Sequence, residues 1–320
     1  MLSSKVATTA ALSRSPDAPG DGTSVDGLAG FTHRYFDVNS TRLHAVVGGR
    51  GPALVLLHGW PYTWAVWRRV MPAFAAGGRT VIAPDLRGTG DSAKPETGYA
   101  KTNVAEDIRQ LVAQVGFDDI DLIGMDIGAM VAYAYAAAHP DHVRHLVLSE
   151  SVLPGFGLEE LMNPAAGGYW HFGFHMQVDV AEMLTAGKEA AYLSSAYTTP
   201  MSEGGLTDAD IADFLGHYAA PGGMRGGFQH YGTLLEDGRT NRTSFRAPLP
   251  MPVLVLNGEH GLPQEPLLNG VHRVASDVRS ALVPDAAHTY AADNPGWVAT
   301  RLNGFFSSGH TPGADNTTAG

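Results

Sequence analysis

The chain has 320 residues, of which 44% are hydrophobic and 17% charged, a composition typical of a soluble globular protein with a sizeable core. Aspartate and glutamate outnumber lysine and arginine by 32 to 21, and the formal charge of −11 disfavours nucleic acid or an anionic membrane as a partner. Because there is no cysteine, disulfides, thiolate metal sites and a cysteine nucleophile are excluded, whereas 14 histidines leave imidazole chemistry open.

Both ends of the chain are rich in small polar residues and glycine. We expect Met1–Gly27 and Ser307–Gly320 to be flexible tails. The N-terminal segment lacks the apolar stretch of a secretory signal, and no segment approaches the ~20 consecutive apolar residues of a membrane span. The sequence therefore predicts a cytoplasmic protein with no membrane partner.

Between the tails, short apolar runs alternate with helical patterns. In chain order, the predicted strands are Ala53–Leu57, Thr80–Ala83, Ile120–Ile123, Leu146–Leu148, Pro252–Leu256 and Val278–Val283. The predicted helices between and after them are Thr102–Val115, Ala129–Ala138 and Trp297–Phe306. This order predicts an α/β fold, with a mostly parallel sheet flanked by helices.

The alternation stops after residue 150. Helices are expected at Val180–Ser195 and Asp208–Tyr218, but no buried strand is apparent before residue 246. We interpret residues 151–245 as a helical cap inserted into a core formed by residues 28–150 and 246–306.

The segment Gly124-Met125-Asp126-Ile127-Gly128 lies directly between a predicted strand and a predicted helix. Flanking glycines permit the sharp turn of a nucleophile elbow, and Asp126 occupies the position where hydrolases usually carry serine. A carboxylate there can displace a leaving group at a saturated carbon and form an ester on the enzyme. An aspartate before a helix is also a common N-cap, and the segment alone leaves both interpretations open.

Hydrolysis of such an ester needs a general base and donors for the oxyanion. His288 follows the last predicted strand, where the hydrolase histidine comes in chain order. The backbone N–H groups of Trp60 and Ile127 are the candidate oxyanion donors, since Trp60 follows a strand end and Ile127 follows the nucleophile. These positions favour the nucleophile interpretation of Asp126.

Four features together resemble one enzyme family: HGWP at 58–61, DLRGTGDS at 85–92, GMDIG at 124–128 and the distal His288. They look like the epoxide hydrolases and the haloacid or haloalkane dehalogenases of the α/β-hydrolase superfamily, over roughly residues 30–306. The resemblance implies an α/β-hydrolase fold, a helical cap and a cofactor-independent hydrolase.

The resemblance also implies an acidic partner for His288. Many members take it from a G-x-x-D pattern, but here the corresponding segment is Gly258-Glu259-His260-Gly261, with glycine at the aspartate position. Another branch takes its acid after the strand that follows the elbow helix, and the matching residue is Glu150. We expect Glu150 to orient His288, with Glu259 as the alternative.

The leaving group distinguishes the enzymes within this family. Haloalkane dehalogenases resemble one another in carrying a tryptophan directly after the nucleophile, where this chain has Ile127. Fluoroacetate dehalogenases carry arginines after the nucleophile to hold the substrate carboxylate, and this chain has Ile127 and Met130 at those positions. Epoxide opening needs donors to the ring oxygen. The segments around His171 and Tyr231 resemble those of the epoxide hydrolase subgroup that uses a histidine and a tyrosine, and we assign these two residues as the ring-opening pair.

We therefore expect an epoxide hydrolase that converts a small apolar epoxide to a vicinal diol, without metal or cofactor. The expected substrate pocket includes Trp60, Pro61, Phe172 and Phe228. Two alternatives remain: a haloacetate or haloalkane dehalogenase with the same nucleophile, and a non-catalytic protein that binds a hydrophobic ligand. The sequence is compatible with a homodimer and does not identify the epoxide.

Overall fold

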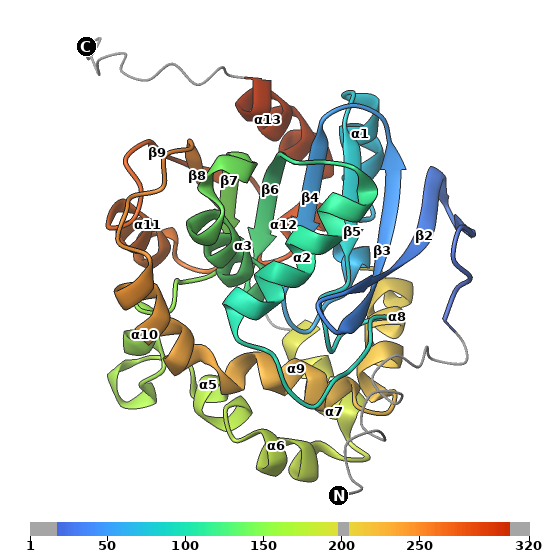
Figure 1. Cartoon of the computed structure of the whole chain (residues 1–320). Helices are drawn as coiled ribbons and strands as arrows, with labels where there is room; N and C mark the ends of the chain where they lie inside the picture. The colour runs from blue at the N-terminus through green and yellow to red at the C-terminus, as the bar shows by residue number, and fades with distance from the viewer. Residues whose placement is uncertain (1–17, 198–204, 308–320) are drawn as a thin grey trace, which may run out of the picture.

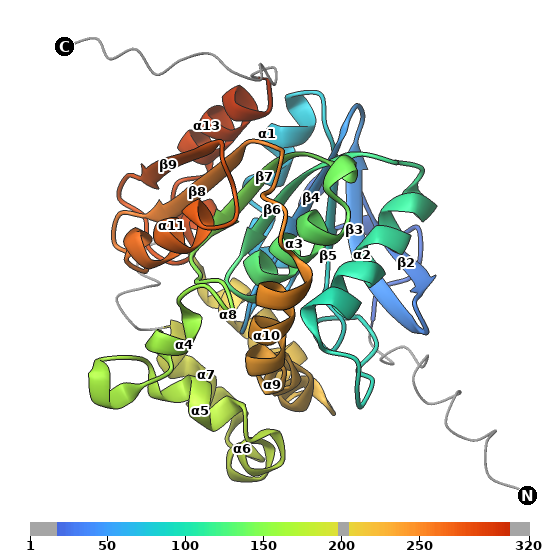
Figure 2. The same ribbon diagram turned by 60° about the vertical axis from the view of Figure 1, so that its left-hand side comes forward.

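The computed structural model describes residues 18–197 and 205–307, and its centre is a nine-stranded sheet in the order β1-β2-β3-β5-β4-β6-β7-β8-β9. Strands β4 to β9 are parallel to their neighbours among themselves, whereas β1, β2 and β3 pair antiparallel at one edge. Figures 1 and 2 show helices on both faces of this sheet. The predicted fold class is confirmed. The strands are β1 (Ser24–Val25), β2 (Leu28–Val38), β3 (Thr41–Gly49), β4 (Ala53–Leu57), β5 (Thr80–Pro84), β6 (Ile120–Met125), β7 (Val143–Ser149), β8 (Val253–Gly258) and β9 (Val278–Val283).

The antiparallel edge was not among the predicted strands. Strand β2 is only partly buried, and histidine, arginine and glycine interrupt the apolar pattern of both β2 and β3. Strand β1 falls within the segment expected to be a tail, and Val25 in it is buried. The ordered chain therefore begins before residue 28. The rest of the expected tails, residues 1–17 and 308–320, lies outside the described residues.

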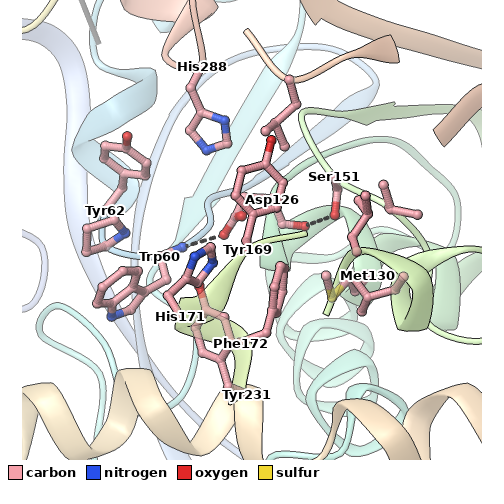
Figure 3. A pocket seen from close by; sticks show the side chains of 15 residues that line it. Trp60, Tyr62, Asp126, Met130, Ser151, Tyr169, His171, Phe172, Tyr231 and His288 are labelled. Carbon is pink, nitrogen blue, oxygen red and sulfur yellow. Dashed lines mark hydrogen bonds between the residues drawn. The ribbon is translucent and has the colours of Figure 1, made fainter. Parts of the chain in front are cut away.

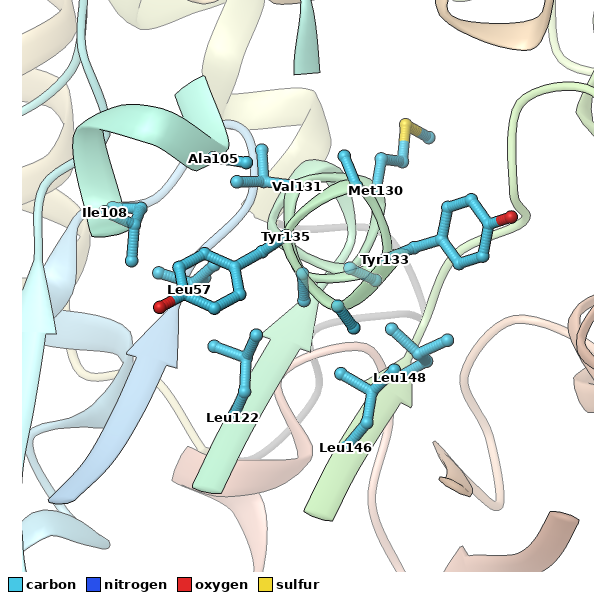
Figure 4. Close-up of a cluster of buried hydrophobic side chains, with 14 of the residues drawn as sticks. Leu57, Ala105, Ile108, Leu122, Met130, Val131, Tyr133, Tyr135, Leu146 and Leu148 are labelled. Atoms are coloured by element: carbon cyan, nitrogen blue, oxygen red, sulfur yellow. The ribbon is translucent and has the colours of Figure 1, made fainter. Parts of the chain in front are cut away.

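Helices cover the two faces of the sheet. Helices α2 (Lys101–Val115), α3 (Ile127–Ala138) and α11 (Gln264–His272) pack in one hydrophobic cluster, and α1 (Met71–Ala76), α12 (Tyr290–Asp293) and α13 (Pro295–Ser307) in another. Figure 4 shows α3 in the first cluster, above leucines of β4, β6 and β7. Because α3 is buried on almost every side, its position relative to the sheet is fixed. In the described part of the chain, no helix is long and apolar enough to cross a membrane.

Between β7 and β8 the described residues form helices and no strand of the sheet. The helices are α4 (Leu158–Leu161), α5 (Trp170–His175), α6 (Val178–Thr185), α7 (Glu189–Tyr197), α8 (Asp208–Ala219), α9 (Gly223–Gly232) and α10 (Leu234–Ser244). Most of them gather at one end of the sheet (Figure 1). The predicted helix over 180–195 is two helices, because the chain turns at Gly187, whose φ of 74° ends the helical path.

Candidate active site

Asp126 lies at the carboxyl end of β6, in a strained backbone conformation with φ 55° and ψ −123°. The two glycines of its turn are required sterically. A Cβ atom on Gly124 would lie 2.3 Å from the carbonyl oxygen of Gly128, and one on Gly128 would lie 2.3 Å from that of Leu57. The side chain of Asp126 makes no N-cap hydrogen bond to α3. The segment is therefore a sharp elbow that presents the carboxylate, rather than a simple helix cap.

The carboxylate of Asp126 faces the two expected backbone donors. The N–H of Trp60 donates to Oδ1 over 2.8 Å, and the N–H of Ile127 favours the charged carboxylate by acting to lower its pKa. Gly59 makes this approach feasible, because a Cβ there would lie 2.3 Å from Oδ1 of Asp126. Once the carboxylate is esterified, the same donors are placed to stabilise an oxyanion on its carbon.

Glu150 and His288 form a buried pair beside the elbow. The Nδ1–H of His288 donates to Oε2 of Glu150 over 3.0 Å. The same carboxylate accepts from the N–H of Gly258 at 2.6 Å and from the N–H of Leu262 at 2.8 Å. Three donors thus hold a fully buried carboxylate in one orientation and leave Nε2 of His288 for other contacts.

The alternative partner, Glu259, makes no hydrogen bond to His288 in the described structure. Its side chain is exposed, and its carboxylate accepts from the backbone N–H of Asp285 rather than from His288. Gly261 explains why the G-x-x-D position is not used, since a Cβ there would lie 2.2 Å from Oε1 of Glu150. The volume that an acid at 261 would need is already filled by Glu150.

His171 and Tyr231 lie across the cavity from His288 (Figure 3). They come from different helices, α5 and α9, and their ring centroids are 6.0 Å apart. Figure 3 shows the hydroxyl of Tyr231 directed toward His171 and Asp126. No hydrogen bond joins either side chain to another of the described residues, so both retain donor capacity toward a ligand in the cavity.

A single cavity of about 140 Å³ connects these groups. Trp60, Pro61 and Phe172 line it as expected, but Phe228 does not. Phe228 is fully buried, with its ring 4.8 Å from that of His175. Sequence reasoning did not assign the other lining residues to the pocket: Tyr62, Met130, Ser151, Val152, Leu158, Leu161, Tyr169 and Leu262. Their proximity in sequence to assigned residues was the available signal.

Burial and the neighbouring charges have opposing effects on the pKa values of Asp126 and His288. Burial raises the pKa of the Asp126 carboxyl, while His288 and the N–H groups of Ile127 and Trp60 act in the opposite direction. Burial acts to lower the pKa of His288, but the hydrogen bond to Glu150 and the negative charges of Glu150 and Asp126 outweigh it, so this pKa is raised. The nucleophile and the base therefore stabilise each other's charged forms.

The two cap side chains are neutral donors. Burial and the nearby His288 lower the pKa of His171 to about 4, and burial raises the pKa of Tyr231 far above its ordinary value. At neutral pH the imidazole is uncharged and the phenol is protonated. Each can donate a hydrogen bond without adding charge to the cavity.

Groups that could hold a metal lie away from this cavity. In the described ranges these are His44 with Asp85 and Asp91, and the exposed set Glu259, His260 and Asp285. Asp85 is already hydrogen-bonded to His44 and to backbone N–H groups.

Comparison with known proteins identifies similar chains. Residues 52–173 match the family model for the alpha/beta hydrolase fold. A soluble epoxide hydrolase of Corynebacterium sp. (strain C12) is 35% identical over 282 residues, 86% of this chain and 97% of that protein. A fluoroacetate dehalogenase of Burkholderia sp. is 38% identical over 46% of this chain and 50% of its own length. The solved structure of the epoxide hydrolase CorEH without ligand has a TM-score of 0.80 and 34% identity, covering 87% of this chain and 99% of that one.

Proposed function

The chain belongs to the epoxide hydrolase family of the α/β-hydrolase fold, and on that basis we propose that it hydrolyses a small apolar epoxide to a vicinal diol. The observation that carries the proposal is the pairing of an aspartate at the elbow with two uncharged donors, His171 and Tyr231, across one apolar cavity. A carboxylate supplies the nucleophile, and the donors assist departure of the ring oxygen.

In the first half-reaction, a carboxylate oxygen of Asp126 attacks an epoxide carbon and the carbon–oxygen bond of the ring breaks. The ring oxygen becomes an alkoxide, which is a stronger base than phenolate and takes a proton from the hydroxyl of Tyr231 while His171 donates a hydrogen bond. The product is a hydroxyalkyl ester of Asp126.

In the second half-reaction, Nε2 of His288 takes a proton from water, and the resulting hydroxide attacks the ester carbon of Asp126. Glu150 stabilises the imidazolium, and the N–H groups of Trp60 and Ile127 stabilise the oxyanion. Collapse of this intermediate breaks the ester bond and restores the carboxylate. His288 gives its one proton to the departing alkoxide of the diol, and the proton of the added hydroxyl passes to the Tyr231 phenolate as the carboxylate of Asp126 forms.

The cavity volume limits the substrate. An apolar protein cavity of ~150 Å³ holds benzene, and the cavity here is about 140 Å³. We propose an epoxide that carries one small aromatic ring or a short alkyl chain, in preference to a polycyclic one. The described residues that line the cavity include no lysine or arginine, so none of them offers a permanently cationic partner for a haloacid carboxylate.

Oxygen labelling tests this mechanism. In a single turnover in ¹⁸O-labelled water, the label should enter the carboxyl group of Asp126, and the first diol released should carry no solvent oxygen. Label in the first diol, with an unlabelled Asp126, would contradict the two-step mechanism. Halide release from fluoroacetate or a bromoalkane, with no diol from a panel of small epoxides, would instead establish the dehalogenase alternative. A chain that binds apolar ligands and turns over none of these compounds would support the non-catalytic interpretation.

A further inference from the structure

A buried ion pair joins the core helix α2 to α10, next to the end of the helix α9 that carries Tyr231, and the proposed mechanism does not use it. Nζ of Lys101 lies 3.1 Å from Oδ2 of Asp237, and the two side chains are only 1% and 4% exposed. Lysine and aspartate are rarely buried so completely unless they are paired. Burial lowers the pKa of Lys101, and Asp237 opposes that effect. The pair must therefore be held in place by further contacts.

These contacts cap two helices reciprocally. Lys101 is the first residue of α2, and its backbone N–H donates to Oδ1 of Asp237 over 2.9 Å, whereas the N-cap residue Ala100 provides no side-chain bond. In return, Nζ of Lys101 donates to the carbonyl oxygen of His230 over 2.7 Å and to Oγ1 of Thr233 over 3.0 Å. A carboxylate thus meets the amino end of α2 and an ammonium meets the carboxyl end of α9, the charges that helix ends favour.

The last turn of α9 is fixed at a second point. The imidazole of His230 is 1% exposed, and its Nε2–H donates to the carbonyl oxygen of Arg87 over 2.9 Å. Arg87 belongs to the loop that follows β5. Earlier in α9, the helix also approaches this loop closely, since a Cβ on Gly226 would lie 2.0 Å from the carbonyl oxygen of Gly88. Figure 1 shows this helix lying beneath the sheet, next to the beginning of α2.

Tyr231 follows His230 directly, so the two attachments act on the residue that precedes the proposed proton donor. Tyr231 has no hydrogen bond from its hydroxyl to another of the described residues, and its orientation depends on the position of α9 and on ring packing. Its ring lies 4.5 Å from that of His175 and 5.9 Å from that of Trp60. Loss of the attachment at His230 would shift the hydroxyl relative to Asp126.

We propose that Lys101 and Asp237 are positioning residues for ring opening, because they hold the last turn of α9 so that the Tyr231 hydroxyl faces the epoxide oxygen. The proposal rests on the epoxide hydrolase function described above. It assigns the pair to the first half-reaction alone. Hydrolysis of the ester depends on His288, Glu150 and the oxyanion donors, none of which belongs to α9 or α10.

The test measures the rates of the two half-reactions separately in the variants Lys101→Met and Asp237→Asn. The second variant is the milder one, since asparagine keeps an oxygen that can accept from the N–H of Lys101. Rapid-quench mass spectrometry of the whole protein measures formation and decay of the ester on Asp126 in a single turnover. Small misplacements of a catalytic group can cost about 100-fold in rate. We expect ester formation to slow by about 10-fold to 100-fold, and ester hydrolysis to stay within about 3-fold of the unmodified enzyme.

Asp121→Asn is the matched control. Asp121 is fully buried, pairs with Arg79, and accepts from Nδ1 of His145 at 2.8 Å, but it lies at the end of β6 away from Asp126. This variant should lower the melting temperature without separating the two half-reactions. The positioning role is refuted if Asp237→Asn slows both half-reactions equally or slows neither of them. It is also refuted if Asp121→Asn selectively slows ester formation. An unmodified enzyme that forms no ester with any epoxide refutes the proposed function as well.

Discussion

Replacement of Glu150 by glutamine tests the carboxylate on which the second half-reaction depends. The change keeps the shape of the side chain but removes its charge and replaces one acceptor oxygen by an NH₂ group. In the structure, Oε1 accepts from Gly258, and Oε2 accepts from Leu262 and His288. An amide therefore cannot satisfy all three donors in either orientation.

The size of the effect follows from these contacts. If the amide nitrogen replaces Oε1, it faces the N–H of Gly258, a donor only 2.6 Å from that position. If it replaces Oε2, it faces both Leu262 and His288, and the imidazole must change tautomer. A buried donor left without an acceptor costs about 1–3 kcal/mol. Loss of the carboxylate that orients a catalytic histidine lowers kcat by about 10⁴ in serine-protease triads, and we expect ester hydrolysis to slow by about 10³ to 10⁴.

Single-turnover kinetics with a small epoxide should show this loss in one step only. Ester formation should continue at nearly the original rate, and the alkylated protein should accumulate in the mass spectrum. Glu259→Gln is the matched control, because Glu259 is exposed and its carboxylate accepts from the backbone N–H of Asp285 rather than from His288. It should leave both steps within about 2-fold, as exposed substitutions usually do. Ester hydrolysis in Glu150→Gln within about 10-fold of the unmodified rate would refute the assignment of Glu150.

Three further predictions concern the same cavity. Gly261→Ala should slow ester hydrolysis and lower the melting temperature, because its Cβ would lie 2.2 Å from Oε1 of Glu150; unchanged kinetics and stability would contradict the packing argument. Leu161 lines both the cavity and a neighbouring hollow of about 350 Å³, so Leu161→Ala should raise kcat/KM for long-chain epoxides relative to short ones. Leu158 lines the cavity but not the hollow, so the control Leu158→Ala should instead favour bulky short substrates. Burial acts to lower the pKa of His288 and Glu150 acts to raise it, and only the neutral imidazole accepts a proton. The rate of ester hydrolysis should therefore rise with pH as His288 loses its proton, and a rate that falls with rising pH would contradict this sign.

Local sequence patterns were sufficient for the parallel strands of the sheet and for the elbow. Short apolar runs specify the buried parallel strands, because both faces of those strands lie in the core. The two glycines around Asp126 are equally informative, since the turn leaves no room for a side chain at either position. Both signals are short-range, so a single sequence contains them.

Contacts between distant segments could not be derived in this way. The choice between Glu150 and Glu259 depends on which carboxylate reaches His288, and the resemblance to known enzymes, not residue spacing, favoured Glu150. Phe228 shows the same limit within one helix: it is three positions before Tyr231, yet only Tyr231 faces the cavity. Which side of α9 faces the nucleophile is set by the packing of that helix against the core, including its bond from Lys101.

The backbone around the acid explains why it can function after β7. Glu150 has a φ of 49° and Asp126 a φ of 55°, at the ends of neighbouring parallel strands. Left-handed conformations of such residues cost about 1–3 kcal/mol each and persist only where the surroundings hold them. Here the N–H of Asp126 donates to the carbonyl oxygen of Ser149 over 3.0 Å, and Oγ of Ser151 donates to the carbonyl oxygen of Asp126 over 2.9 Å. The residues on both sides of Glu150 thus bind the backbone of the nucleophile. Because of this, the acid and the nucleophile are held by one set of strand contacts, while the ring-opening donors come from separate helices. Substitution of Glu150 should therefore affect ester hydrolysis, and substitution of His171 or Tyr231 should affect ring opening.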